Sequence, residues 1–558
     1  MIKLINEVDI FELQDLIVNE TSHIVAVQRM MNLALKISKT DACFFYSLDT
    51  NNYISLDYSC NQSLKISKNG IDNLVYAPIV SLEEQRQKPV KTVVERSIIN
   101  REIINYDHIY NIEGIDNSFF EKYDAENNYL TTSVLTIPLI SKKSEVVGVA
   151  QFVNSKDENG KNIPFGIEIQ RSLVFICNIL ALLSENRRLK ESYGHLLESF
   201  IEVIARAIDA KSPYTGNHCQ HVPVITRMLA TAAVQEENGP LADFELSPEE
   251  WYSLHIASWL HDCGKLTTSE YVVDKATKLE TINNRIHEIR NRFEILRRDA
   301  HIEYLKKRLA NLEDKEKLQE DFVLTVKQLE EDFDFVAKCN IGDTPIAEED
   351  ITRLREISKN KFKRYFSRMK GISWAERENI KDTELYDNPS YENLLQNRED
   401  HLANGYNHGE IYNLEIKRGT INAEERNKIN EHIEVTIDML KALPFPRELS
   451  KVVEYAGAHH ERMDGKGYPN GLTGDQMSVP ARIMAIADIF EALTASDRPY
   501  KETKKLSQVL QIMQNMKNTG HIDPDIYRVF VNSKVYLEYA KQYMQPEQID
   551  ELTPGDYL

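Results

Sequence analysis

The stretch His459-His460-Glu461-Arg462-Met463-Asp464-Gly465-Lys466-Gly467-Tyr468-Pro469 carries two adjacent histidines ahead of a glycine-rich turn. A second pair of potential ligands opens the segment His261-Asp262-Cys263-Gly264-Lys265. Imidazole nitrogens together with carboxylate oxygens suit borderline divalent metals, and two metals need a carboxylate that can bridge them. A structural zinc site is not expected, because thiolate ligands are missing from the pattern. The two segments therefore predict a metal centre, rather than a helical core that is rich in histidine by accident.

The chain around these segments is expected to be helical from residue 200 onward. Between Lys265 and Ile341 there is neither glycine nor proline, so this stretch is unlike a series of turns. Its apolar residues follow helical spacing in two runs, separated by the mostly charged residues 311–317. We expect two long antiparallel helices, a coiled-coil-like insertion over residues 267–410. The helical domain would then consist of residues 201–266 and 411–558.

The first 185 residues are expected to form a separate α/β domain. Apolar runs at 42–48, 133–140 and 146–154 predict strands, and the polar residues 141–145 predict that the last two are antiparallel neighbours. A long helix is predicted from about residue 165 to beyond residue 198, and its part at 186–200 would connect the two domains.

The charge balance limits what the chain can bind. The 558 residues include 67 basic and 87 acidic ones, which gives a net charge of −20. Binding to DNA or to anionic lipid needs a basic surface, so neither is expected as the main function. A local anion site remains open, because bound metals or a few basic side chains can reverse the sign within one cleft.

A cytoplasmic location without a membrane span is expected. The longest apolar run, 173–183, is shorter than the ~20 residues that a bilayer requires. The N-terminus lacks the apolar core of a signal peptide. The six cysteines are widely spaced without a C-x-x-C pair, which favours a reducing compartment.

Residues 1–185 resemble a GAF domain. The likeness rests on S-V-L-T-I-P-L at 133–139, G-V-A-Q-F-V-N at 148–154 and the helix ending in E-N-x-x-L at 185–189. The resemblance implies either a small-molecule sensor or a dimerising module, and no ligand is identified. We expect a homodimer formed through this domain and the connecting helix, with the domain regulating the helical part.

The helical part resembles the HD-GYP group of HD metallophosphohydrolases. Residues 261–265 fit H-D-x-G-K, residues 459–469 fit H-H-E-x-x-D-G-x-G-Y-P, and 482–488 and 498–501 fit the motifs that follow. The resemblance implies an all-helical domain with two or three iron or manganese ions that hydrolyses a cyclic dinucleotide, chiefly cyclic di-GMP to pGpG or GMP. Alternatives are a phosphodiesterase for cyclic GMP-AMP or another nucleotide, and a signalling scaffold without activity.

The resemblance also implies roles for individual residues. Asp262 would bridge the metals, a hydroxide between them would be the nucleophile, and Lys265 would steady it or the phosphate. Tyr468 is a candidate for packing on a base, and Arg498 and Lys501 for contacting phosphate. The implied metal ligands are His218, His261, Asp262, His432, His459, His460 and Asp488.

The sequence departs from the family pattern at three points. Tyr214 stands where members with a third metal carry a glutamate, so we expect two metals. His221 replaces a usual arginine, and is expected to be a structural or supporting histidine rather than a ligand. The insertion leaves two candidates for one ligand; His432 lies 27 residues before His459, close to family spacing, and is preferred to His287.

Overall fold

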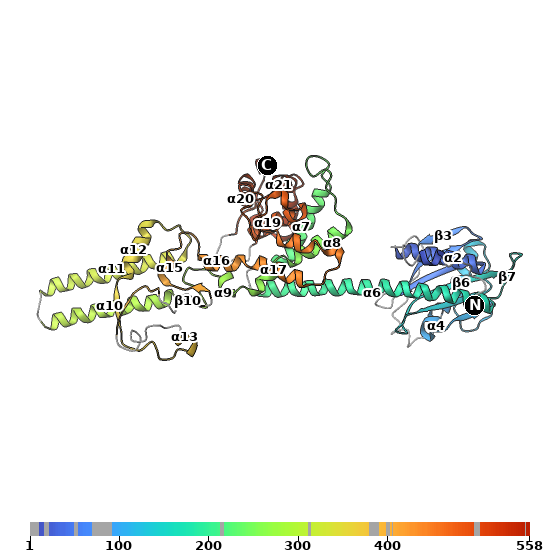
Figure 1. Cartoon of the computed structure of the whole chain (residues 1–558), viewed down its shortest axis with the longest axis horizontal. Coiled ribbons are helices and arrows are strands. Elements are labelled where there is room, and N and C mark those ends of the chain that lie inside the picture. Colours follow the sequence, from blue (N-terminus) through green and yellow to red (C-terminus); the bar gives the residue numbers. More distant parts are fainter. Residues whose placement is uncertain are drawn as a thin grey trace. The chain divides into compact units, whose positions relative to one another are not determined.

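The computed structural model describes residues 11–15, 22–48, 54–69, 92–211, 217–310, 314–378, 390–397, 402–403, 405–495, 503–552 and 554–557. The chain divides into two compact units, residues 1–199 and 200–558, and Figure 1 labels the elements of each. The fold class expected from the sequence is confirmed, since an α/β unit is followed by a largely helical one.

The first unit is built on one antiparallel sheet with the strand order β3-β2-β1-β6-β5-β4, and β7 pairs with β6. The predicted neighbours β5 and β6 are paired in register, with Ile137 opposite Ala150. The strands are β1 Thr40–Leu48, β2 Ile54–Asn61, β3 Ile66–Asn69, β4 Ile104–Tyr106, β5 Val134–Ile140, β6 Val146–Lys156 and β7 Asn162–Ile163.

Helices cover both faces of this sheet because side chains alternate along its central strand. Cys43 and Phe45 belong to a core with α2 (His23–Ser38) and the first part of α6 (Ile167–Lys211). Phe44 and Tyr46 belong to a second core, with residues of α4 (Val93–Asn100) and α5 (Ser118–Asn127). The domain is therefore a three-layer structure with the sheet in the middle.

Helix α6 is the one helix among the described residues whose length and composition would allow it to cross a membrane. Its apolar window is 39% buried within the protein. Leu173, Ile176 and Leu180 of this helix lie fully buried in the core of the first unit. This burial gives α6 a role as a core helix, while the absence of a membrane span stays a prediction.

The second unit contains a helical core in which α7 packs against both α8 and α19, and α17 packs against the 3-10 turn Cys263–Thr267. Gly264, the glycine of the H-D-x-G-K segment, lies where this turn contacts α17 too closely for a side chain. A Cβ at Gly264 would lie 1.9 Å from the carbonyl oxygen of His432, and the Gly264 N–H donates to Thr436 Oγ1 at 2.9 Å. The helices of this core are α7 His218–Val234, α8 Pro248–Leu260, α9 Glu270–Val273, α16 Ala423–Asn430, α17 His432–Ala442, α18 Val452–Gly457, α19 Val479–Thr494, α20 Leu506–Asn518, α21 Pro524–Asn532 and α22 Val535–Tyr543.

The insertion contains the predicted pair of long helices, α10 (Ile286–Leu309) and α11 (Lys315–Ile341), which pack side by side (Figure 1). Part of the predicted turn between them lies outside the described residues. The sequence predicts a wholly helical insertion, and this is incorrect, because two short two-stranded sheets follow the helices. Charged residues flank the buried Phe362 in the first of these strands, a period-two pattern that is easily missed in so short a segment. The remaining elements are α12 Glu348–Ser358, β8 Lys361–Arg364, α13 Trp374–Glu378, β9 Ser390–Asn393, β10 Leu402–Ala403, β11 Tyr406–Asn407 and α15 Glu410–Leu414.

Buried ion pairs fasten the base of the insertion. The Glu410 carboxylate is fully buried and lies 2.9 Å from Arg285 Nη2 and 2.7 Å from Arg292 Nη1. It also accepts the Gln396 N–H at 2.8 Å. Burial alone would raise the pKa of Glu410, but the two guanidinium groups outweigh that effect and hold its pKa below the usual value. One carboxylate thus joins α10, α15 and the chain between them.

We expect Glu410→Ala to lower the free energy of unfolding by about 3–5 kcal/mol, because two largely buried guanidinium groups lose their partner. Urea unfolding of the full chain measures this. Glu356→Ala, which removes an exposed pair with Lys359, is the matched control and should leave the midpoint unchanged. Since the pKa of Glu410 is lowered, its stabilisation should be complete above the ordinary carboxyl range and should fade as pH falls through the lowered value. Equal midpoints for Glu410→Ala and the unsubstituted protein would contradict this role.

Candidate metal centre

Histidine and aspartate side chains from five segments converge in the second unit. His218 is the first residue of α7, and His261 and Asp262 follow directly after α8. His432 begins α17, His459 and His460 follow α18, and Asp488 lies in α19. Three overlapping groups have ligand atoms within 4.8 Å of one another: His432 with His459 and His460, His218 with His261 and Asp488, and His261 with Asp262 and His459.

Asp262 lies at the middle of this cluster and is 1% exposed. Its Oδ2 atom is 3.2 Å from His218 Nε2, 3.2 Å from His261 Nε2 and 2.5 Å from Lys265 Nζ. Its Oδ1 atom faces the other way, at 3.3 Å from His432 Nε2. The two oxygens of one carboxylate therefore face different imidazoles, which is the arrangement that a bridging ligand requires.

Three of the histidines are oriented by the backbone of their own turn. His261 Nδ1 donates to the Ser258 carbonyl at 2.8 Å, and His459 Nδ1 donates to the Ala456 carbonyl at 2.6 Å. His432 Nδ1 makes the same contact with the carbonyl three residues before it. A carbonyl can only accept, so each Nδ1 carries a proton, and Nε2 is the nitrogen that faces the cluster.

The donor set fits divalent metal ions. Asp262 Oδ1, His432 Nε2 and His459 Nε2 are buried and have no hydrogen-bond partner among the described residues. Such orphaned buried atoms are costly unless another group satisfies them. Burial lowers the pKa of His460 to about 4, and burial with the adjacent His460 lowers the pKa of His459, so both rings are neutral and able to bind a cation.

The carboxylates of the cluster are ionised. Burial alone would raise the pKa of Asp262, but Lys265 and His261 outweigh it and hold that pKa well below the usual range. His218 and His261 do the same for the pKa of Asp488. The neutral imidazoles of His459 and His460 and the charged carboxylates together provide nitrogen and oxygen ligands that iron or manganese accepts.

The sequence did not reveal Glu491, which belongs to the site. Its buried carboxylate is hydrogen-bonded to His218 Nδ1 and fixes the orientation of that ring. His221 Nδ1 lies 3.6 Å from the other oxygen of Glu491, a supporting position beside the cluster rather than in it. The available signal was spacing, since Glu491 follows Asp488 by three residues on the same face of α19.

Glu461 is a second residue whose role became clear only in the structure. It is buried, and its carboxylate accepts the backbone N–H groups of Asn470 at 2.7 Å and Leu472 at 2.9 Å. These bonds hold the glycine-rich turn against the cluster. Tyr468 in that turn stacks on the His460 ring, with centroids 4.9 Å apart.

The alternative ligand His287 falls outside the cluster. His287 is exposed on α10, and its Nδ1 lies 2.6 Å from Arg290 Nη1, whereas His432 lies inside the cluster. Tyr214, Arg498 and Lys501 lie outside the described residues, so their expected roles have no structural counterpart here.

Comparison with known proteins finds similarity to HD domains in part of the second unit. Residues 396–526 match the model of the HD domain. A 3'3'-cGAMP-specific phosphodiesterase from Vibrio cholerae is 41% identical over 125 residues, which are 22% of this chain and 28% of that protein. A cyclic di-GMP phosphodiesterase from Pseudomonas aeruginosa is 43% identical over 82 residues, 15% of this chain and 19% of that protein. The chain thus spans less than a third of the length of these relatives, and the predicted resemblance is confirmed over that part.

Solved structures similar to the chain include GAF domains. One, from an Acinetobacter phosphoenolpyruvate-protein phosphotransferase, is 16% identical with a TM-score of 0.24, and covers 34% of this chain and 99% of its own. Another, from a Coxiella burnetii phosphotransferase of the same name, is 14% identical with a TM-score of 0.25, and covers 33% of this chain and 96% of its own.

Proposed function

We propose that the chain is a metal-dependent phosphodiesterase of the HD-GYP type that hydrolyses a cyclic dinucleotide. The observation that carries the proposal is the buried cluster of five histidines and two aspartates around Asp262. The relatives with the same domain are named as phosphodiesterases for cyclic di-GMP and for 3'3'-cGAMP. Cyclic di-GMP, cleaved to pGpG or GMP, is the substrate expected from the sequence, and the 41% identity to a cGAMP-specific relative favours cyclic GMP-AMP as the second candidate.

The ligands would be His218, His261, Asp262, His432, His459, His460 and Asp488. Two divalent ions bound there, iron or manganese, would supply an activated hydroxide at neutral pH and positive charge against the phosphate. Asp262 would hold both sites at a fixed separation. Glu491 would keep the His218 ring in place, as outer carboxylates commonly do for metal-binding histidines.

Two further side chains are candidates for contacting the substrate. Burial lowers the pKa of Lys265, but the adjacent Asp262 raises it more, so the ammonium is charged. It is therefore available to a phosphate oxygen at the edge of the cluster. The partly buried Tyr468 ring beside His460 is a candidate for packing on a base, and Arg498 and Lys501 remain candidates for phosphate contacts from their sequence motif.

We further propose that α6 pairs with its counterpart in a second copy of the chain. Phe175, Leu182, Leu189 and Leu196 repeat every seven residues and are exposed. Ile179, Asn186 and Tyr193 repeat in the same way four positions later. This 4-3 spacing is that of a coiled-coil seam, and a single asparagine in such a seam favours two parallel strands in one register.

A regulatory role of residues 1–185 would act through this helix. An effector of the GAF-like domain can shift activity only if it favours one arrangement of the helix pair over another. The continuity of α6, from Ile167 to Lys211, supports the idea because it runs from the sheet domain into the second unit. A cytoplasmic setting is supported by the six cysteines, all of which are free thiols.

Asp262→Ala should reduce turnover about a thousandfold or more, because both metal sites lose a ligand. His432→Ala should be similarly severe, and His287→Ala close to neutral. The assay incubates metal-loaded protein with cyclic di-GMP, 3'3'-cGAMP and linear dinucleotides and separates the products by chromatography, with folding checked by circular dichroism. Substantial activity in folded Asp262→Ala would refute the assignment, and turnover of none of these compounds by the unsubstituted protein would refute the function.

Two metal ions per chain are expected, since the position of the additional glutamate is occupied by Tyr214. Protein purified without chelator and analysed by mass spectrometry of the elements should contain about two iron or manganese ions per chain. Asp262→Ala should contain far less metal, and His287→Ala the full amount. A reproducible value of three would contradict this count.

Leu196→Glu should convert the dimer to a monomer, because it places a charge in the seam, where the side chain is 52% exposed in the single chain. His195→Glu, an exposed neighbour outside the seam, is the matched control and should remain dimeric. Light scattering gives the mass, and turnover measured on the same samples shows whether pairing controls activity. A monomeric unsubstituted protein would rule out the seam, and equal turnover of monomer and dimer would rule out regulation through it.

A further inference from the structure

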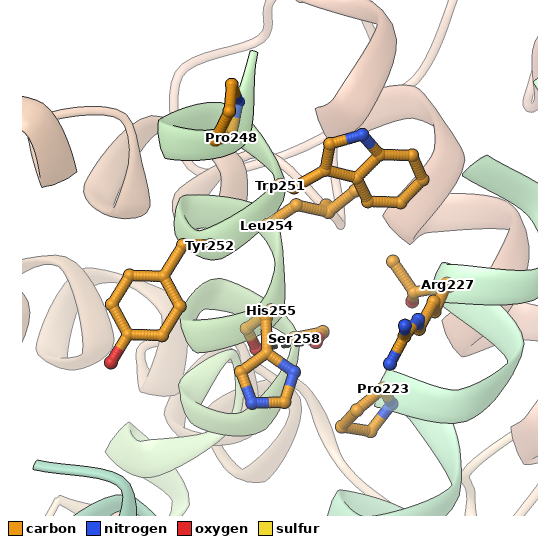
Figure 2. Close-up of a pocket in the computed structure, with 9 residues that line it drawn as sticks. Pro223, Arg227, Pro248, Trp251, Tyr252, Leu254, His255 and Ser258 are labelled. Atoms are coloured by element: carbon orange, nitrogen blue, oxygen red, sulfur yellow. Dashed lines mark hydrogen bonds between the residues drawn. The ribbon is translucent and has the colours of Figure 1, made fainter. Parts of the chain in front are cut away.

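A cleft of about 290 Å³ lies between α7 and α8, separate from the candidate metal ligands. Figure 2 shows its walls, with Trp251, His255 and Ser258 on α8 and Pro223 and Arg227 on the neighbouring helix. None of the described residues that line it is acidic. Nothing in the proposed reaction uses this cleft.

The α8 wall offers flat surfaces to a ligand. Trp251 and His255 are four residues apart, so they lie one turn above each other on the same face of the helix. Both are only partly buried, while Leu254 and Ser258 are buried beside them. Pro223 adds an apolar surface on the opposite side. An indole and an imidazole in this arrangement favour a planar aromatic ring as the bound group.

Arg227 provides the charge. Its side chain is exposed, and within the described part of the chain it makes no ion pair. In Figure 2 it lies across the cleft from Trp251 and His255. A guanidinium group binds phosphate through two parallel hydrogen bonds and also stacks on aromatic rings. The chain as a whole has a net charge of −20, whereas Arg227 makes this cleft locally positive.

The size of the cleft limits the ligand. Known small-molecule sites begin at roughly 300 Å³, so this cleft is at the lower end of that range. A cyclic dinucleotide has two bases and two phosphates, and would need about twice the space of a mononucleotide. We propose that the cleft binds a planar aromatic anion of mononucleotide size, with the base against Trp251 and His255 and the phosphate on Arg227.

The cleft shares a turn of α8 with the candidate metal centre. The Ser258 carbonyl accepts the Nδ1 proton of His261 at 2.8 Å, and Ser258 Oγ donates to the His255 carbonyl at 2.7 Å. A ligand that moves this turn would therefore also move the His261 ring.

Calorimetric titration of the full-length, metal-loaded protein with GMP and with AMP tests the proposal. Saturable binding is expected. Inorganic phosphate and guanosine should each bind at least about tenfold more weakly, because each provides only half of the contacts. Arg227→Gln should weaken nucleotide binding about tenfold, and Trp251→Ala should weaken it similarly. Arg377→Gln, which removes an exposed arginine of α13, is the matched control and should bind as the unsubstituted protein does.

Arg227 is exposed, so its replacement should not affect folding, and the melting temperature of each variant is measured alongside. Nucleotide binding of unchanged affinity in Arg227→Gln would overturn the proposal, because it would place the nucleotide elsewhere, for example at the metal centre. The absence of saturable binding of both nucleotides to the unsubstituted protein would also overturn it.

Discussion

The buried carboxylate of Asp262 is the constraint on which the second unit depends. An ionised group at 1% exposure is tolerated only when its surroundings compensate for the lost hydration. Here the compensation comes from Lys265 in the adjacent turn, from His261 after α8 and from His218 at the start of α7. His432 at the start of α17 faces the other carboxylate oxygen. Three elements must therefore meet at one point, and the absence of a side chain at Gly264 allows α17 to come that close.

The insertion leaves this convergence intact because its two ends are joined to each other. Lys275, near its beginning, is fully buried and lies 2.8 Å from Glu425, which follows its end. Thr420 Oγ1 donates to the Lys275 carbonyl at 3.0 Å. Glu425 in turn caps α16, by accepting the Asn422 N–H. The chain thus leaves and re-enters the helical core at neighbouring points, so the spacing between His261 and His432 in the sequence is not reflected in space.

Much of the cluster could be predicted because its candidate ligands occur in short, dense patterns. His261 with Asp262 and His459 with His460 are adjacent in sequence, and the spacing to His459 separated His432 from His287. Glu491 and Glu461 could not be predicted in the same way, because their roles depend on which backbone groups and rings fold back onto them. Apolar runs predicted three strands of the first unit and the pairing of the last two, but not the order of the whole sheet. The short strands of the insertion were missed because four residues are too few to display a period.

The attachment of His261, His432 and His459 to their own backbone has a consequence for how the protein tolerates change. Each ring is oriented by a peptide carbonyl three residues earlier. This carbonyl is present whatever the side chain, so only a substitution that breaks the turn would remove it. His218 differs, because its ring is oriented by the side chain of Glu491, 273 residues away in sequence. Random substitutions elsewhere in the chain would therefore rarely disturb the orientation of these three rings. The orientation of His218 would be lost whenever Glu491 is replaced, so these two distant residues must be conserved together.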